Sequence, residues 1–342
     1  MLQLYGSIAD AATPEQGAAN VGLYGVSTPA EVVARWAPAG VILINTNPQD
    51  SARPRLATRN IQTALQLKSL TTALRNLSGD QDLIIAIDQE GGRVNRLAPL
   101  VGKEPSAAAV GVSGATTAAA FERTAKLLTR LGINLDFAPV ADVVPVDVPK
   151  ASVIGDRAFG SDADLVSNRV ATAVEALQTG HVAAVAKHWP GHGSTLIDSH
   201  LTAPVLDYSD PSFADRQIMP FGEAAQRGVA AIMVGHLAVP AWDSTGRVAT
   251  ISRPILDRLG HKYCGVIATD SLWMGGIRRY GSDEDLALDA VKAGVDLLVM
   301  PVDIDKASRN IATGADRDPG VRARLVDAAT RVAILRSKYR SG

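Results

Sequence analysis

Short apolar runs alternate with longer amphipathic stretches along the whole of this 342-residue chain, and this alternation limits the folds open to it. We expect strands at residues 3–9, 40–45, 83–88, 134–139, 183–188, 230–235, 265–270 and 295–300. The stretches between and after them predict helices at residues 29–36, 57–77, 115–131, 164–179, 212–227, 284–293 and 321–338. The pattern therefore predicts a strand-then-helix unit that repeats eight times.

The expected strands are apolar almost without interruption, as in VILI at 41–44 and LIIAI at 83–87. Such runs are typical of parallel strands that are buried on both faces. Eight of them predict an α/β fold, a single (β/α)₈ barrel over residues 1–342 with its active site at the carboxyl ends of the strands. The alternative is an open doubly wound sheet, which would be unusually large and lacks a glycine-rich phosphate turn after its first strand.

Composition excludes several other classes of protein. Hydrophobic residues make up 46% of the chain and charged residues 20%, which indicates a globular core. A net charge of -1 argues against a nucleic-acid surface, and no apolar run approaches the ~20 residues that span a bilayer. The single cysteine, Cys264, excludes a disulfide framework and a thiolate metal cage. No export signal is visible, so the protein is either cytoplasmic or exported with a signal segment that this sequence lacks.

Polar or ionisable residues follow the expected strands again and again. They are Asn45, Asp88, Asp142, His188, His236 and Asp270. In a barrel the carboxyl ends of all strands meet at one face, and that face carries the chemistry. The whole set therefore predicts a functional site at this face, although any one of these residues is also a common way to enter a loop.

The first charged segment after a strand is DQEGGRVNR at 88–96. It carries two carboxylates and two arginines, and its glycine pair turns the backbone back over the barrel mouth. Asp88 and Arg96 would clamp neighbouring hydroxyls of one polar ring. The alternative interpretation is a local ion-pair cluster with a structural role.

Three of the six histidines lie in the segment KHWPGHGSTLIDSH at 187–200. Zinc binding by His188 and His192 is disfavoured, because Pro190 and Gly191 break the helix that would place both rings on one face. We therefore expect no metal site.

The same segment ends with Asp198 and His200, which predict an acid–base dyad. In an extended loop alternate residues project to one side, so the carboxylate can orient the imidazole and favour its protonated form. The glycines around the dyad suggest a mobile catalytic lid. The alternative interpretation is that Asp198 and His200 only cap a surface loop.

Asp270 closes a hydrophobic strand and is a candidate carboxylate nucleophile, since a strand end fixes its orientation. His236 ends the preceding strand, where a substrate contact and a structural role are equally good interpretations. Aromatic faces at a barrel mouth suit the apolar faces of sugar rings, although packing between loops explains them nearly as well. Three of the four tryptophans follow strand ends: Trp189, Trp242 and Trp273.

Four motifs together resemble glycoside hydrolase family 3, in particular its bacterial β-N-acetylglucosaminidases (β-N-acetylhexosaminidases). The motifs are DQEGGRV at 88–94, KHWPGHG at 187–193, DSH at 198–200 and TDSLWM at 269–274. IGDRAFG at 154–160 is also typical of this branch. The likeness covers essentially the whole chain.

The resemblance implies a retaining, two-step mechanism with no cofactor and no metal. Asp270 matches the nucleophile of the family, and His200, held by Asp198, matches its acid/base. Ser194 and Ser271 depart from the pattern, since many relatives carry Asp at these positions. The positions that match hydroxyl-binding residues are Asp88, Arg96, Arg157, Lys187 and His188, with His236, Trp273 and Met274 as further candidates.

The expected reaction is removal of terminal β-linked N-acetylglucosamine from peptidoglycan fragments, a small carbohydrate substrate, by a monomer. Phosphorolysis is one alternative, because a neutral imidazole does not repel incoming phosphate as a carboxylate would. A β-glucosidase is another alternative, which the Asp-x-His dyad disfavours. A barrel that only binds carbohydrate is disfavoured by the presence of Asp270, Asp198 and His200 together.

Overall fold

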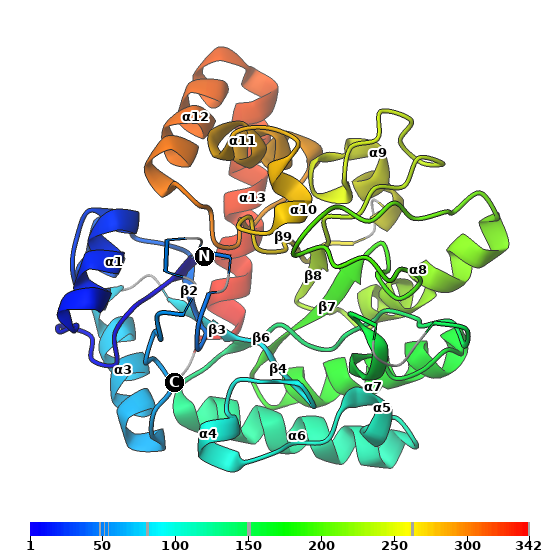
Figure 1. Ribbon diagram of the computed structural model, residues 1–342, viewed down its shortest axis with the longest axis horizontal. Coiled ribbons are helices and arrows are strands. Elements are labelled where there is room, and N and C mark those ends of the chain that lie inside the picture. Colours follow the sequence, from blue (N-terminus) through cyan, green and yellow to red (C-terminus); the bar gives the residue numbers. More distant parts are fainter. Residues whose placement is uncertain are drawn as a thin grey trace.

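The computed structural model describes residues 1–47, 49–50, 52–53, 55–79, 82–148, 152–260 and 263–340. Within these residues, seven parallel strands form one curled sheet in the order β1-β2-β3-β6-β7-β8-β9, and helices surround it (Figure 1). The strands are β1 (Leu2–Gln3), β2 (Gly40–Leu43), β3 (Ile84–Ile87), β6 (Leu135–Asp136), β7 (Ala183–Trp189), β8 (Ala231–Val234) and β9 (Val266–Thr269). The prediction of an α/β fold with a parallel sheet is confirmed.

Longer helices lie between successive strands and after the last strand along the chain. They are α1 (Pro14–Tyr24), α2 (Pro29–Trp36), α3 (Ala64–Leu77), α6 (Gly114–Leu131), α7 (Ala163–Thr179), α8 (Pro211–Gln226), α11 (Asp283–Ala293), α12 (Ile304–Arg317) and α13 (Pro319–Lys338). Shorter elements lie in the loops: the hairpin β4 (Gln89–Gly91) and β5 (Val94–Asn95), the helices α4 (Ala98–Val101), α5 (Ala107–Val110), α9 (Arg253–Leu256) and α10 (Gly275–Arg278), and the 3₁₀ turns η1 (Gly155–Arg157), η2 (Ala249–Ile251) and η3 (Asp257–Leu259).

The eighth expected strand, residues 295–300, forms no regular strand, but it lies between the two edges of the sheet. Leu297 makes one isolated parallel bridge with Ala268 of β9. On the other side, Met300 N donates to Met1 O at 2.8 Å, and the Met1 nitrogen donates to Leu298 O at 2.7 Å. The closed eight-stranded barrel stays a prediction, since the assigned sheet has seven strands.

Several expected elements are shorter than predicted; the strand expected at 134–139, for example, is only Leu135–Asp136. The predicted strand 3–9 ends at Gln3, and Tyr5 N donates to the Asn20 side chain while Gly6 N donates to Thr58 O. The predicted helix 57–77 begins only at Ala64, after the Thr63 cap. The sequence also did not predict α1, α12 or the β4–β5 hairpin. Helix α2 does begin and end as predicted.

Side chains on the two faces of the sheet belong to two separate apolar clusters. The inner cluster contains Ile84 and Ala86 of β3, and Val266 and Ala268 of β9. The outer cluster lies between the sheet and the helices. It contains the alternate residues of the strands, such as Ile85 of β3. Successive side chains of a strand point to opposite faces, so every second residue of these runs faces the interior of the curled sheet. Both faces are buried, as the continuous apolar runs predict.

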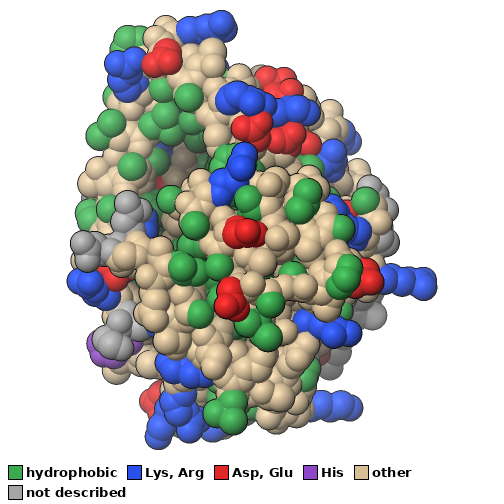
Figure 2. Space-filling model, turned by 90° about the vertical axis from the view of Figure 1, so that its left-hand side faces the viewer, with side chains coloured by type: hydrophobic (Ala, Val, Ile, Leu, Met, Phe, Trp, Pro, Cys, Tyr) green, Lys and Arg blue, Asp and Glu red, His purple; other side chains and the backbone are tan. Residues whose placement is uncertain are grey.

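The molecular surface carries charges of both signs. On the face shown in Figure 2, Lys and Arg side chains lie among Asp and Glu side chains and hydrophobic residues, without a broad area of one sign. No helix of the described chain combines the length and the apolar character needed to cross a membrane.

Candidate active site

A pocket of about 250 Å³ opens at the carboxyl ends of the strands. It is lined by Ile42, Ile44, Thr46, Asn47, Gln49, Asp88, Glu90, Val94, Arg96, Phe137, Arg157, Lys187, His188, Met233, His200, Asp270, Ser271, Met274, Val299 and Met300. The pocket therefore brings together eight of the predicted site residues: Asp88, Arg96, Arg157, Lys187, His188, His200, Asp270 and Met274.

The alternation of side chains along the strands places three of these residues in the pocket. Side chains that point to the interior of the curled sheet form the inner row of each strand. Asp88 continues the inner row of β3, Lys187 continues that of β7, and Asp270 continues that of β9. A regular strand would turn His188 away from Lys187. The pairing of β7 with β8 is irregular between Lys187 and Trp189, and both Lys187 and His188 line the pocket.

A buried ion cluster forms one wall of the pocket. The Arg157 guanidinium donates two hydrogen bonds to Glu90, both at 2.8 Å, and Lys187 Nζ lies 2.6 Å from Glu90 Oε1 and 2.8 Å from Asp88 Oδ1. Arg96 lies farther from Asp88, at 4.0 Å. The ion pairs with Glu90 and Asp88 hold the side chains of Arg157 and Lys187 in place. The remaining N–H groups of these two side chains can therefore donate to ligand oxygens.

The same cluster shifts the pKa values of its members. Burial acts to raise the pKa of Glu90, but Arg157 and Lys187 outweigh it and hold that pKa well below its usual range. Burial acts to lower the pKa of Lys187, and the carboxylates of Asp88 and Glu90 raise it above its usual value. Glu90 and Lys187 are therefore both charged near neutral pH.

Asp142 orients the histidine next to this cluster. Its carboxylate lies 2.8 Å from His188 Nδ1 and accepts from the backbone N–H groups of His188 and His192. Since the carboxylate occupies Nδ1, the Nε2 of His188 is left to face Arg157, at 3.4 Å from its Nη2. The imidazole is thus held in one orientation at the pocket wall.

The electrostatic surroundings of Asp270 keep it ionised. Burial acts to raise the pKa of its carboxyl, but His188, His236 and His200, together with the Ser271 N–H, outweigh burial and lower the pKa below its usual value. The Ser271 N–H donates to Asp270 Oδ1 at 2.7 Å. A carboxylate nucleophile needs this ionised form.

The Asp198–His200 pair lies on a loop at the rim of the pocket. Asp198 Oδ1 lies 2.8 Å from His200 Nδ1 and accepts from the His200 backbone N–H at 2.9 Å. The loop is tied to the segment after β9, because Gly275 N donates to His200 O and Gly276 N to Ser199 O. Asp198 itself does not line the pocket, and it orients the ring that does.

The glycines that suggested a mobile lid have a packing role in the structure. A Cβ on Gly193 would meet Val143 O at 2.0 Å, and Gly191, at φ +113°, lies against Tyr208 and Gln217. Close approach of backbone segments accounts for glycine at both positions. The glycines are therefore not evidence for a hinge.

His236 and the tryptophans lie outside the pocket lining. His236 is fully buried, with Nδ1 2.7 Å from Thr250 Oγ1 and Nε2 2.9 Å from Ser271 O. Trp189 packs in the core against Phe221 and Trp242. Packing between loops, and not contact with a ligand, therefore explains Trp189 and Trp242. Trp273 packs partly buried against the inner apolar cluster.

The pocket also contains residues that the sequence did not single out. Glu90 lies within a motif, but its role became visible only with its partners Arg157 and Lys187. Met233 follows from the inner row of β8, whereas Asn47, in the loop after β2, gave no signal in the sequence. His188 and His192 have rings 5.8 Å apart. Among the described residues, no group of three or more His, Cys, Asp or Glu side chains could hold a metal ion.

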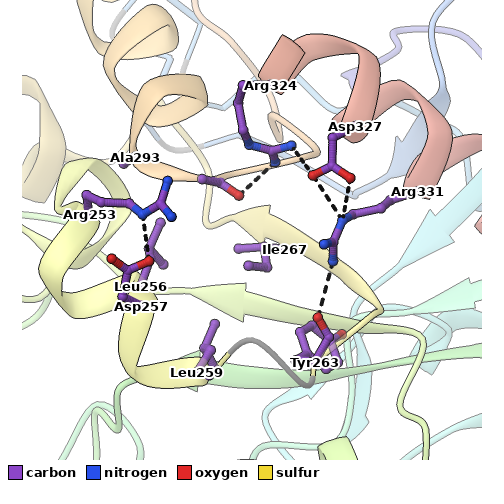
Figure 3. Close-up of a pocket in the computed structure, with 12 residues that line it drawn as sticks. Arg253, Leu256, Asp257, Leu259, Tyr263, Ile267, Ala293, Arg324, Asp327 and Arg331 are labelled. Carbon is purple, nitrogen blue, oxygen red and sulfur yellow. Dashed lines mark hydrogen bonds and ion pairs between the residues drawn. The ribbon is translucent and has the colours of Figure 1, made fainter. Parts of the chain in front are cut away.

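A second pocket, of about 190 Å³, lies beside the outer face of β9 (Figure 3). Its charged side chains are paired with one another: Arg253 with Asp257 at 2.6 Å, and Arg331 with Asp327 at 3.3 Å. Ile267, on the outer side of β9, lines it. None of the residues predicted for the site lines this pocket.

Residues 31–335 match the Glycosyl hydrolase family 3 N terminal domain. The chain belongs to this family of glycoside hydrolases. The resemblance seen in the sequence motifs is thus confirmed over most of the chain.

Several relatives carry the name of one activity. The chain is 33% identical over 302 residues to beta-hexosaminidase A of Pseudoalteromonas piscicida, covering 80% of this chain and 47% of that protein. It is 32% identical over 303 residues to the beta-hexosaminidase of Thioalkalivibrio sulfidiphilus, covering 84% of this chain and 85% of the relative. The chain thus spans about half of the first relative and most of the second.

Solved structures of similar proteins share the fold. A family 3 beta-N-acetylglucosaminidase from Paenibacillus sp. superposes with a TM-score of 0.81 at 28% identity, covering 99% of this chain and 61% of that one. The beta-N-acetylhexosaminidase of Beutenbergia cavernae gives a TM-score of 0.75 at 26% identity, covering 98% and 96%. The overall architecture of the chain is therefore similar to that of these two structures.

Proposed function

We propose that this protein is a retaining, exo-acting β-N-acetylglucosaminidase with Asp270 as nucleophile and His200 as acid/base. One observation carries the proposal: Asp270 and His200 line the same pocket, across which a sugar would present its anomeric carbon. The names of the relatives, beta-hexosaminidase and beta-N-acetylglucosaminidase, support the choice of an N-acetylated sugar.

The proposed reaction has two steps. An Asp270 carboxylate oxygen attacks C1 while protonated His200 gives its proton to the departing glycosidic oxygen, which leaves a covalent glycosyl ester. His200, now neutral, then takes a proton from water as the water oxygen attacks C1 and releases Asp270. Asp198 supports both steps, since its carboxylate orients the imidazole through Nδ1 and stabilises its cationic form.

The size of the pocket supports action on a chain end. At about 250 Å³, the pocket is smaller than the roughly 300–1,000 Å³ typical of sites for drug-sized ligands, and it suits one sugar ring. The charged wall would bind hydroxyls of that ring through Asp88, Arg96, Arg157, Lys187 and His188. Residues 295–300 would complete the barrel and the pocket wall, to which they contribute Val299 and Met300. We infer GlcNAc-terminated peptidoglycan fragments as the substrate class.

Covalent trapping tests the mechanism. The protein is incubated with a fluorinated N-acetylglucosaminyl fluoride, which slows the second step, and its intact mass is measured before peptide mapping. We expect one adduct, located on Asp270 and absent in Asp270→Asn. No adduct, or an adduct on another residue, would contradict the covalent mechanism.

Product analysis separates hydrolysis from phosphorolysis. A neutral imidazole at position 200 would tolerate incoming phosphate, which makes phosphorolysis the second candidate. With a nitrophenyl N-acetylglucosaminide, we expect free N-acetylglucosamine at a rate that does not depend on phosphate. Release of sugar 1-phosphate would instead identify a phosphorylase.

A further inference from the structure

Ser199 lies between the two residues of the proposed acid–base dyad and, unlike them, is buried. Its exposed fraction is 2%, whereas the side chains of Asp198 and His200 are 38% and 44% exposed. Side chains as exposed as these two make few packing contacts, so the position of the dyad depends on what fixes the backbone of the dyad segment (residues 198–200). A buried residue in the middle of that segment can fix it.

The side chain of Ser199 bonds to a histidine near the start of the same loop, which runs from β7 to α8. Ser199 Oγ lies 3.0 Å from His192 Nε2, and His192 is 1% exposed. The backbone of His192 is itself fixed, because its N–H donates to Asp142 Oδ1 at 2.7 Å. The hydrogen bond therefore connects the dyad segment to the part of the loop that lies closest to the end of β7.

This bond is the polar contact that explains a buried imidazole at position 192. Among the described residues, the other ring nitrogen of His192, Nδ1, has no hydrogen-bond partner. Burial and the neighbouring His188 lower the pKa of His192 to about 4, so the ring is neutral near neutral pH. An apolar side chain could fill the same space without the cost of burying two ring nitrogens. The contact with Ser199 is what the histidine adds.

The main chain of the dyad segment bonds to a second region, the residues that follow β9. Gly276 N donates to Ser199 O at 3.0 Å, and Gly275 N donates to His200 O at 2.8 Å. The same region begins with Asp270, the proposed nucleophile, directly after β9. Ser199 is thus held on two sides, by its hydroxyl toward the end of β7 and by its carbonyl toward the end of β9.

We propose that Ser199 and His192 are positioning residues of the reaction, whose side-chain hydrogen bond holds the dyad segment so that His200 can protonate the leaving group opposite Asp270. The inference rests on the proposed function, because it takes His200 as the proton donor. Neither Ser199 nor His192 lines the pocket, so both act through His200 and not through contact with the substrate. Without the bond, the dyad keeps its own contacts but loses one of the two connections that fix its place.

A leaving-group series tests the proposal in Ser199→Ala, which removes one hydroxyl. The value of kcat/KM is measured for aryl N-acetylglucosaminides with good to poor leaving groups, because it reports the step in which the leaving oxygen takes its proton. The loss of one hydrogen bond predicts about a tenfold fall for the poorest leaving group. Nitrophenolate needs little protonation, so its glycoside should show a much smaller fall. A fall of equal size across the series would indicate a merely structural role and overturn the proposal.

Ser167→Ala is the matched control. The Ser167 hydroxyl is also buried, but it donates to Ala163 O at 2.7 Å within α7 and does not line the pocket. We expect this variant to show no dependence on the leaving group beyond that of the wild type. The same added dependence in Ser167→Ala would overturn the assignment to Ser199.

A double-mutant cycle assigns the effect to the pair. His192→Ala should show the same kind of dependence on the leaving group as Ser199→Ala. If the two residues act through one bond, the double variant should fall no further than His192→Ala alone for the poorest leaving group. Losses that multiply would show that the two side chains act independently and would refute the pairing.

His200→Ala separates this inference from the proposed function. If its activity depends on the leaving group and that of Ser199→Ala does not, the positioning role is wrong and the proposed function stands. If neither variant shows the dependence, the role of His200 as proton donor is wrong as well.

Discussion

The substitution Glu90→Gln tests the electrostatic account of the pocket wall. The Glu90 side chain is 3% exposed and pairs with Arg157, which is 11% exposed, and with Lys187, which is 3% exposed. A neutral amide of the same shape would leave two buried cations to share Asp88. Breaking a buried pair from one side typically costs about 3–5 kcal/mol, and we expect a loss of unfolding free energy of about that size at pH 7.

Urea denaturation of the wild type and the variant measures this loss. Glu223→Gln is the matched control, since Glu223 pairs with Arg227 at 3.0 Å on the surface of α8, where such pairs contribute about 0.2–1 kcal/mol. A loss in Glu90→Gln no larger than that of the control would refute the account of a tightly coupled buried cluster.

The difference in unfolding free energy between the wild type and Glu90→Gln also depends on pH, and this dependence gives a second test of the electrostatic account. The pKa of Glu90 is lowered in the folded state, whereas an unfolded Glu titrates near about 4.3. The stability that Glu90 contributes is therefore fully present above that value and is lost as the pH falls toward the folded pKa. We expect the gap between wild type and Glu90→Gln to be constant from pH 6 to 8 and to narrow below about pH 4. A gap that does not change at low pH would mean that the charge of Glu90 is not its source.

Three further predictions follow from single contacts. His200→Ala should lower kcat/KM by about 10²–10⁴-fold for glycosides with poor leaving groups and far less for nitrophenyl glycosides, measured across an aryl series; an equal loss across the series would contradict its role as proton donor. Gly193→Ala should destabilise the fold by about 1–3 kcal/mol or more, because the new Cβ would meet Val143 O at 2.0 Å. Gly222→Ala is the control and should not destabilise the fold, because there is open space around Gly222. Equal shifts of the urea midpoint in the two variants would refute this prediction. Trp189→Ala should cost about 3–5 kcal/mol of unfolding free energy without a change in KM, and a raised KM would instead place Trp189 at the ligand.

Much of the site could be predicted because it repeats a local rule. Asp88, Lys187 and Asp270 extend the inner rows of their strands, and side-chain alternation together with parallel pairing brings such positions to one rim. The Asp198–His200 pair is likewise local, being two residues apart. Other contacts gave no such signal: Glu90 meets Arg157 from 67 positions away.

The sequence by itself determined the family and the parallel α/β fold, because motif spacing and apolar periodicity are properties of neighbouring residues. Only the tertiary structure decided what those residues touch. It put Trp189 in the core, made Gly193 a point of close packing, and buried Glu90 between Arg157 and Lys187. Each of these outcomes depends on a surface supplied by a distant segment. Burial and hydrogen-bond partners are therefore set when the sheet curls and its loops converge, and no local pattern encodes them.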